Sequence, residues 1–251
     1  MDLGLRGKKA LVTGGTKGIG RAIADGFAAE GASVAICARN PAEIEAAVTA
    51  LRGHGVTAFG RALDVADAAS LKGWVADAAA ALGGVDVLVC NVSAFAAGDN
   101  AESWEAAFRT DLMHSVAAVA AALPWLEASA SASVTFIASV SGVEIDFAAG
   151  PYGAAKAALI HYSKALAHRL APKGIRVNTV SPGNTYFEGG GWHRFERDAP
   201  DFFQAAMALN PTGRMGTPEE VADGVVFLAS PRASRISGTN LVIDGALTRG
   251  V

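Results

Sequence analysis

The sequence has few cysteines, few charges and no long uninterrupted apolar run. Cys37 and Cys90 are the two cysteines among 251 residues, and both stand in apolar segments typical of strands, which predicts buried free thiols rather than a disulfide. No apolar run approaches the roughly 20 residues that a membrane-spanning helix needs. The first six residues lack the apolar core of a signal peptide, so we expect a cytoplasmic protein without a membrane partner.

Neither the net charge nor the spacing of the histidines gives a reason to expect nucleic acid or a metal ion. Charged residues make up 18% of the chain and the formal net charge is −3, which favours small-molecule partners. The five histidines stand at no metal-binding spacing from cysteines or carboxylates, so no metal site is predicted.

The arrangement of apolar segments predicts an α/β fold. Apolar residues make up 51% of the chain and no linker interrupts it, so residues 1–251 are expected to form a single domain. Predicted strands alternate with predicted helices, which favours a doubly wound parallel sheet with right-handed crossovers. The strands are expected near residues 8–13, 31–37, 56–63, 86–91, 134–138, 174–180 and 241–243, and the main helices near 20–30, 41–52, 103–127, from 151 onward and 218–229.

A glycine-rich turn joins the first predicted strand to the first helix. Gly14, Gly18 and Gly20 let the backbone turn tightly and approach a phosphate, and the start of the following helix favours negative charge. A glycine loop alone is a weak signal, but its place in a βαβ unit predicts a dinucleotide site.

The end of the second predicted strand bears on the choice of dinucleotide. The sequence there is Ala38-Arg39-Asn40, without the carboxylate that would accept from a free ribose 2′-hydroxyl. Arg39 and Lys17 offer positive charge suited to a 2′-phosphate, so NADP(H) is predicted over NAD(H), although either side chain alone can simply be solvated.

Two further strand ends carry polar residues. Asp64, followed by Val65, is placed either to accept from an adenine amino group or to cap the next helix, and the sequence leaves both open. Asn91 ends the fourth predicted strand, at the edge of a parallel sheet where ligands gather.

The residues that indicate proton transfer are Ser139, Tyr152 and Lys156. Pro151 is expected at a helix start, so Tyr152 and Lys156 project from one face, where the ammonium would lower the pKa of the phenol. Ser139 follows a strand and could donate to a carbonyl oxygen. Ser141 is expected to point to the opposite side. Taken alone, the pair at 152 and 156 is more often an ordinary helix surface.

Residues 184–211 are rich in aromatics and include three successive glycines. The pattern is irregular and suits a mobile lid over an apolar substrate. A packed helical insertion or a subunit contact fits the same pattern.

Together these motifs resemble the short-chain dehydrogenase/reductase family over nearly the whole chain. The segment 13–20 is similar to its Thr-Gly-x-x-x-Gly-x-Gly loop, Ser139 and Tyr152-x-x-x-Lys156 match its catalytic residues, and the segment 178–183 is similar to its Asn-x-x-x-Pro-Gly element. The resemblance implies a Rossmann-type sheet of about seven strands, hydride transfer between a nicotinamide and an alcohol or ketone, and commonly a homotetramer. The cofactor-binding residues it implies are Gly14, Thr16, Lys17, Gly18, Ile19, Gly20, Arg39, Asp64, Val65, Asn91, Tyr152, Lys156, Pro182, Gly183 and Thr185.

Two departures from the family pattern stand out. The family's usual Asn-Asn-Ala-Gly is replaced by Cys90-Asn91-Val92-Ser93. Asp111 stands where the family usually has an asparagine that helps hold a water beside the active-site lysine. We expect Asp111 to take part in this proton relay, or to pair with Lys156 and alter the pH optimum.

The sequence therefore predicts an NADP(H)-dependent oxidoreductase that interconverts a ketone and a secondary alcohol. In the reducing direction Ser139 orients the carbonyl and Tyr152 supplies the proton. A 3-oxoacyl thioester is one substrate class that the resemblance suggests, beside a cyclic ketone, a sugar or an aromatic ketone. A cofactor-binding sensor or subunit with weak or no turnover is the alternative, motivated by Asp111 and the altered segment after the fourth strand.

Overall fold

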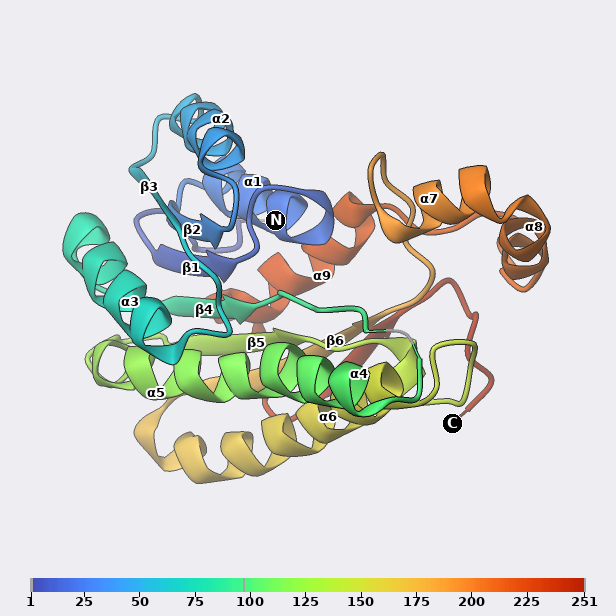
Figure 1. Ribbon diagram of the computed structural model, residues 1–251. Helices are drawn as coiled ribbons and strands as arrows, with labels where there is room; N and C mark the ends of the chain where they lie inside the picture. Colours follow the sequence, from blue (N-terminus) through green and yellow to red (C-terminus); the bar gives the residue numbers. More distant parts are fainter. Residues whose placement is uncertain (1, 97, 251) are drawn as a thin grey trace.

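The structure, a computed structural model, describes residues 2–96 and 98–250. In this part of the chain seven parallel strands form one sheet in the order β3-β2-β1-β4-β5-β6-β7 (Figure 1). The order reverses between β1 and β4, as in a Rossmann-type fold. The strands are β1 Lys9–Thr13, β2 Ser33–Ala38, β3 Ala58–Ala62, β4 Val87–Cys90, β5 Ser133–Ile137, β6 Arg176–Pro182 and β7 Asn240–Ile243.

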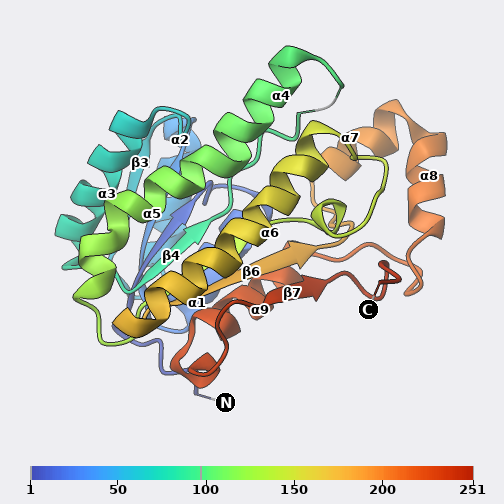
Figure 2. The same ribbon diagram turned by 90° about the horizontal axis from the view of Figure 1, so that it is seen from below.

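Helices cover both faces of the sheet, which confirms the expected doubly wound single domain. One core joins α1, α2 and α9 to the sheet, and the other joins α3, α5 and α6 to its opposite face. Figures 1 and 2 show these two layers, with α7 and α8 projecting beyond the edge where the first turns of α6 also lie. The helices are α1 Gly18–Ala29, α2 Pro41–Arg52, α3 Ala68–Leu82, α4 Ala101–Ala107, α5 His114–Glu127, α6 Pro151–Leu170, α7 Gly191–Asp198, α8 Pro200–Ala208 and α9 Pro218–Ala229.

The segment 184–211 contains α7 and α8, whose aromatic side chains form a small core of their own, in agreement with the packed helical insertion that the sequence left open. One predicted element was wrong in detail: the single helix expected over residues 103–127 is interrupted by a π-helical segment, η1, over Phe108–Met113. The composition of a segment does not reveal a π turn, which inserts one residue per turn and is frequent at functional sites.

The central strands β1, β4 and β5 are buried almost throughout, which explains their largely apolar sequence. Cys37 and Cys90 are buried free thiols, as expected, and burial raises the pKa of each to about 12. Among the described residues every helix is too short or too polar to span a bilayer.

Candidate active site

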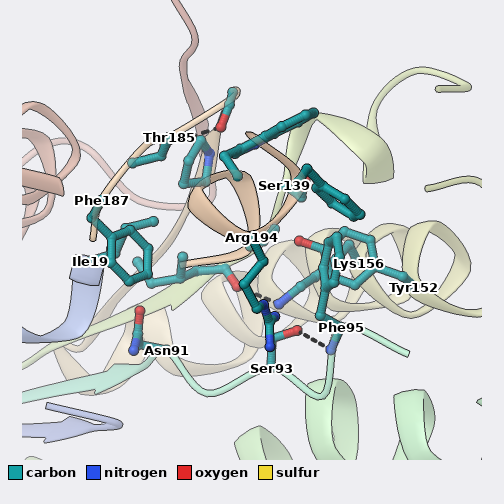
Figure 3. Close-up of a pocket in the computed structure, with 17 residues that line it drawn as sticks. Ile19, Asn91, Ser93, Phe95, Ser139, Tyr152, Lys156, Thr185, Phe187 and Arg194 are labelled. Atoms are coloured by element: carbon teal, nitrogen blue, oxygen red, sulfur yellow. Dashed lines mark hydrogen bonds between the residues drawn. The ribbon is translucent and has the colours of Figure 1, made fainter. Parts of the chain in front are cut away.

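Two adjoining cavities lie at the carboxyl ends of the strands. The smaller, of about 280 Å³, contains Ser139, Tyr152 and Lys156, and we call it the catalytic cavity (Figure 3). The larger, of about 700 Å³, runs past the glycine loop and the ends of β2 and β3, and we call it the dinucleotide cleft. Residues that line both are Asn91, Ser93, Phe187, Gly191 and Arg194.

A close backbone contact between the turn after β5 and α6 brings Ser139 near Tyr152. Ser139 follows β5 and caps a 3-10 turn, η2, over Val140–Gly142. This turn lies so near α6 that a Cβ added at Gly142 would stand 2.7 Å from the backbone carbonyl carbon of Lys156. Only glycine fits this contact, and it holds Ser139 over the first turns of α6, where Tyr152 and Lys156 share one face.

Lys156 is almost completely buried and has two polar partners. Its Nζ donates to the Ile137 carbonyl over 3.0 Å and lies 3.1 Å from Asp111 Oδ1. The side chains of Lys156 and Asp111 are 2% and 0% exposed, so each charge depends on the other. The expected pairing of these two residues is therefore present, and the π-helical segment is what carries Asp111 to it.

Asp111 also supports the loop that follows β4. Its Oδ2 accepts from the Ala94 N–H over 3.0 Å. The next residue, Phe95, has a φ of 45° and packs edge-on against the Tyr152 ring, with 5.0 Å between centroids. Asp111 thus links the lysine to a wall of the catalytic cavity.

The pKa of Tyr152 differs from the expectation. Burial raises it above its ordinary value, while the Lys156 ammonium and the Ser139 hydroxyl lower it and the carboxylates of Asp111 and Asp146 raise it. The predicted effect of Lys156 has the right sign, but the net shift is upward because desolvation of the phenolate outweighs it. The phenol is therefore protonated at neutral pH in this state.

The prediction for Ser141 was wrong. Its hydroxyl does not point away from Ser139, because the chain turns after β5 instead of continuing as a strand. Ser139 Oγ donates to Ser141 Oγ over 3.2 Å, and Ser141 Oγ donates to Asp146 Oδ2 over 2.7 Å. Asp146 was missed, since nothing in its sequence neighbourhood marks it.

The glycine loop is so tightly packed that it requires glycine at two of its positions. Gly14 has a φ of 69°, and a Cβ added at Gly20 would stand 2.2 Å from the Gly14 carbonyl oxygen. Asn91 donates from its side chain to the Thr13 carbonyl over 3.1 Å, so it fixes this loop as well as lining both cavities. Gly14, Thr16 and Lys17 line the dinucleotide cleft, and Ile19 lines the catalytic cavity.

The two cations expected at a 2′-phosphate have different surroundings. Arg39 lines the dinucleotide cleft. Lys17 also lines it, but its Nζ lies 2.7 Å from Glu43 Oε1. Thr16 and Asn40 donate to the same carboxylate, and the hydrogen bond from Lys17 holds the pKa of Glu43 below its usual range. This carboxylate was not predicted, because it lies two residues inside α2.

The structure excludes one of the two predicted roles of Asp64. The cap of α3 is Asp67, which accepts from the Ala69 N–H over 3.0 Å. Asp64 instead accepts from the Ala66 N–H and lines the dinucleotide cleft together with Val65. It is therefore free of the helix-capping role and stands where an adenine was expected.

The segment after β6 closes the space between the cavities. Pro182, Gly183 and Thr185 line the catalytic cavity, and Thr185 Oγ1 donates to the Gly183 carbonyl over 3.1 Å. Phe187 lies over the glycine loop, with its Cζ 2.5 Å from where a Cβ of Gly18 would stand, and Figure 3 shows it beside Ile19. Gly18 is thereby covered, which is why neither cavity reaches it.

The remaining walls are mostly aromatic. Trp192 and Phe195 come from α7, and Phe95 from the loop after β4. Arg194 is the cation among the α7 residues that face the cavity. The aromatic content of 184–211 had indicated Trp192 and Phe195, whereas Phe95 and Arg194 had no sequence signal, and Ser93 was marked only as part of a departure from the family pattern.

Comparison with known proteins gives consistent matches over the whole chain. A family model described as enoyl-(acyl carrier protein) reductase matches residues 14–248. An isoepoxydon dehydrogenase of Penicillium expansum is 40% identical over 255 residues, covering 100% of this chain and 98% of the relative. A 2,5-dichloro-2,5-cyclohexadiene-1,4-diol dehydrogenase of Sphingobium indicum is 35% identical over 253 residues, covering 98% of each.

Solved structures agree with these matches. The crystal structure of L-sorbose reductase from Gluconobacter frateurii, complexed with NADPH and L-sorbose, superposes with a TM-score of 0.92. The two proteins are 29% identical, and the match covers 100% of both chains.

Proposed function

The chain belongs to the short-chain dehydrogenase/reductase family of oxidoreductases, and from this premise we propose that it interconverts a secondary alcohol and a ketone on a small ring-shaped molecule with NADP(H). The observation that carries the proposal is that Ser139, Tyr152 and Lys156 line one cavity that adjoins the dinucleotide cleft. A hydroxyl, a phenol and an ammonium around one small space suit the transfer of a proton to or from a substrate oxygen.

The cofactor assignment rests on the donor set of the cleft. The glycine loop would receive the pyrophosphate, Arg39 and Lys17 the 2′-phosphate, and Asp64 and Val65 the adenine. Pro182, Gly183 and Thr185 would border the nicotinamide. When bound, the nicotinamide supplies or accepts a hydride. Glu43 opposes this assignment in part, because its carboxylate neutralises Lys17.

The protein's own residues handle the proton. Tyr152 Oη gives its proton to the substrate oxygen in reduction and takes it back in oxidation. Lys156 favours the phenolate that results, and Ser139 makes the second hydrogen bond to the substrate oxygen. Asp111 pairs with the buried Lys156 and holds its side chain in place, which is how we interpret its position in the relay.

The substrate class rests on the size and walls of the catalytic cavity. Its volume of about 280 Å³ is small, and Phe95, Trp192 and Phe195 offer flat apolar surfaces. A six-membered ring fits such walls better than an extended acyl chain. The similarity to a cyclohexadiene-diol dehydrogenase supports a ring that carries a secondary hydroxyl. We propose that α7 and α8 form a lid on this cavity.

The test is a turnover screen with purified protein. The panel contains 2-cyclohexen-1-one, cyclohexane-1,4-dione, L-sorbose and acetoacetyl-CoA, each with NADPH and NADH. We expect the cyclic ketones to be reduced with NADPH, Tyr152→Phe to remove turnover without loss of NADPH binding, and Arg39→Ala to weaken NADPH binding selectively. Preference for acetoacetyl-CoA would favour an acyl thioester substrate. Cofactor binding without turnover of any panel member would favour a binding protein.

A further inference from the structure

A short chain of hydrogen bonds leads from the catalytic cavity to Asp146. Ser139 Oγ lies 3.2 Å from Ser141 Oγ, and Ser141 Oγ lies 2.7 Å from Asp146 Oδ2. Ser139 Oγ also accepts from the Ser141 N–H over 3.2 Å. Ser139 lines the catalytic cavity, whereas Ser141 and Asp146 stand behind it.

Each serine hydroxyl has one proton to donate, and this determines which group is the donor in each of the two hydrogen bonds. A carboxylate accepts hydrogen bonds and cannot donate, so Ser141 must give its single hydroxyl proton to Asp146. Ser141 then has no proton for Ser139, and the contact between the two hydroxyls requires Ser139 to be the donor. While Tyr152 is protonated, the proton of Ser139 is thus directed toward Ser141, and a lone pair remains for the substrate.

We propose that Asp146, acting through Ser141, is a positioning residue that holds Ser139 as a hydrogen-bond acceptor toward the cavity, so that the site binds the alcohol in preference to the ketone. The inference rests on the proposed function. An alcohol oxygen accepts from the Tyr152 hydroxyl and donates its own proton to Ser139. A ketone has no proton to give, so it gains a bond from Ser139 only if Ser139 first releases Ser141.

One substitution at Asp146 should reverse the donor and acceptor roles in these hydrogen bonds. Asp146 Oδ1 accepts from the Ala148 N–H over 2.8 Å. In Asp146→Asn this N–H holds the amide oxygen in place, so the amide nitrogen faces Ser141 and donates to it. Ser141 then donates to Ser139, and the Ser139 proton becomes available to the cavity. Ser141→Ala frees the same proton by removing its acceptor.

The experiment measures binding instead of turnover. The overall equilibrium fixes the ratio of the two kcat/KM values, so the effect must appear in dissociation constants. Ligand-observed NMR titrations give the dissociation constant of 2-cyclohexen-1-one with the protein–NADP⁺ complex and of 2-cyclohexen-1-ol with the protein–NADPH complex. We expect the ketone-to-alcohol ratio of these constants to fall by about threefold to tenfold in Asp146→Asn and in Ser141→Ala.

The matched control is Asp67→Asn, which removes an exposed carboxylate from the cap of α3 and should leave the ratio unchanged, because asparagine caps helices equally well. An unchanged ratio in Ser141→Ala, or equal weakening of both probes, would overturn the inference even if Asp146→Asn fails to fold. A wild-type protein without oxidoreductase turnover contradicts the proposed function. An active wild type whose ratio does not respond contradicts the Asp146 inference alone.

Discussion

Asp111 Oδ1 lies 3.1 Å from Lys156 Nζ, and both side chains are almost completely buried. A buried lysine without a counter-charge would be strongly destabilising, and a buried carboxylate likewise. The pair therefore holds Lys156 beside Tyr152, with its Nζ 5.6 Å from the centre of the Tyr152 ring. The Asp111 carboxylate also opposes the lowering of the Tyr152 pKa by Lys156.

Replacing Asp111 by asparagine should lower the pKa of Tyr152. The Asp111 carboxylate raises that pKa, so its removal leaves the Lys156 charge less opposed. The acidic limb of kcat/KM for alcohol oxidation should therefore move to lower pH. The measurement is a pH–rate profile of both proteins between pH 5 and 10.

A second variant, Asp111→Ala, tests how much Asp111 contributes to stability. It removes the acceptor for the Ala94 N–H as well as the counter-charge of Lys156. We expect a loss of about 3 to 5 kcal/mol in the free energy of unfolding, measured by urea denaturation. Stability equal to wild type in Asp111→Ala would show that the ion pair is not needed to bury Lys156.

Glu43→Gln should strengthen NADPH binding. The change releases Lys17 from its ion pair and removes a negative charge beside the proposed 2′-phosphate site. Affinity for NADPH should rise by about twofold to fivefold, and affinity for NADH should change little. Fluorescence titration with each cofactor measures both.

Glu45→Gln is the matched control for charge, because Glu45 is exposed on the same helix. Equal gains for NADPH and NADH in Glu43→Gln would place the 2′-phosphate elsewhere.

Phe187→Ala should strengthen cofactor binding. The Phe187 ring covers Gly18, so a phosphate can reach this part of the loop only after the ring moves. Removing the ring removes that requirement, and the NADPH dissociation constant should fall by about threefold to tenfold. Phe227→Ala, a partly exposed phenylalanine on α9, is the control. Weaker NADPH binding in Phe187→Ala would mean that the ring packs on the cofactor instead.

His114 makes stability depend on pH. It is buried beneath the active site, where its Nδ1 donates to the Thr110 carbonyl, and burial lowers its pKa from 6.5 to about 4. The unfolded chain therefore binds a proton between pH 6.5 and 4 that the folded chain excludes. The stabilisation is complete above pH 6.5 and is lost as the pH falls toward 4, by about 3 kcal/mol.

Urea denaturation of wild type and His114→Gln at pH 8, 6 and 4 tests this dependence. The variant should be less stable at pH 8 and should lose less stability on acidification. His54→Gln, at an exposed position, should follow wild type. Parallel loss in wild type and His114→Gln would assign the acid sensitivity to other groups.

The sequence by itself determined the architecture and indicated the residues that we propose to react. Alternating apolar segments determine a doubly wound parallel sheet, because the central strands are buried on both faces and the helices on one. The glycine loop and the spacing of Tyr152 and Lys156 are local, since a turn of backbone or one turn of helix sets them. Such short-range geometry can be read from residue types alone.

The tertiary structure decided the interactions between distant segments. Asp111, the counter-charge of Lys156, precedes it by 45 residues. Only the packing of η1 against α6 brings the two side chains together. The turn after β5 places Ser141 beside Ser139, and its approach to α6 depends on the contact at Gly142. The upward pKa shift of Tyr152 depends on how much protein surrounds the phenol, which only the folded chain sets.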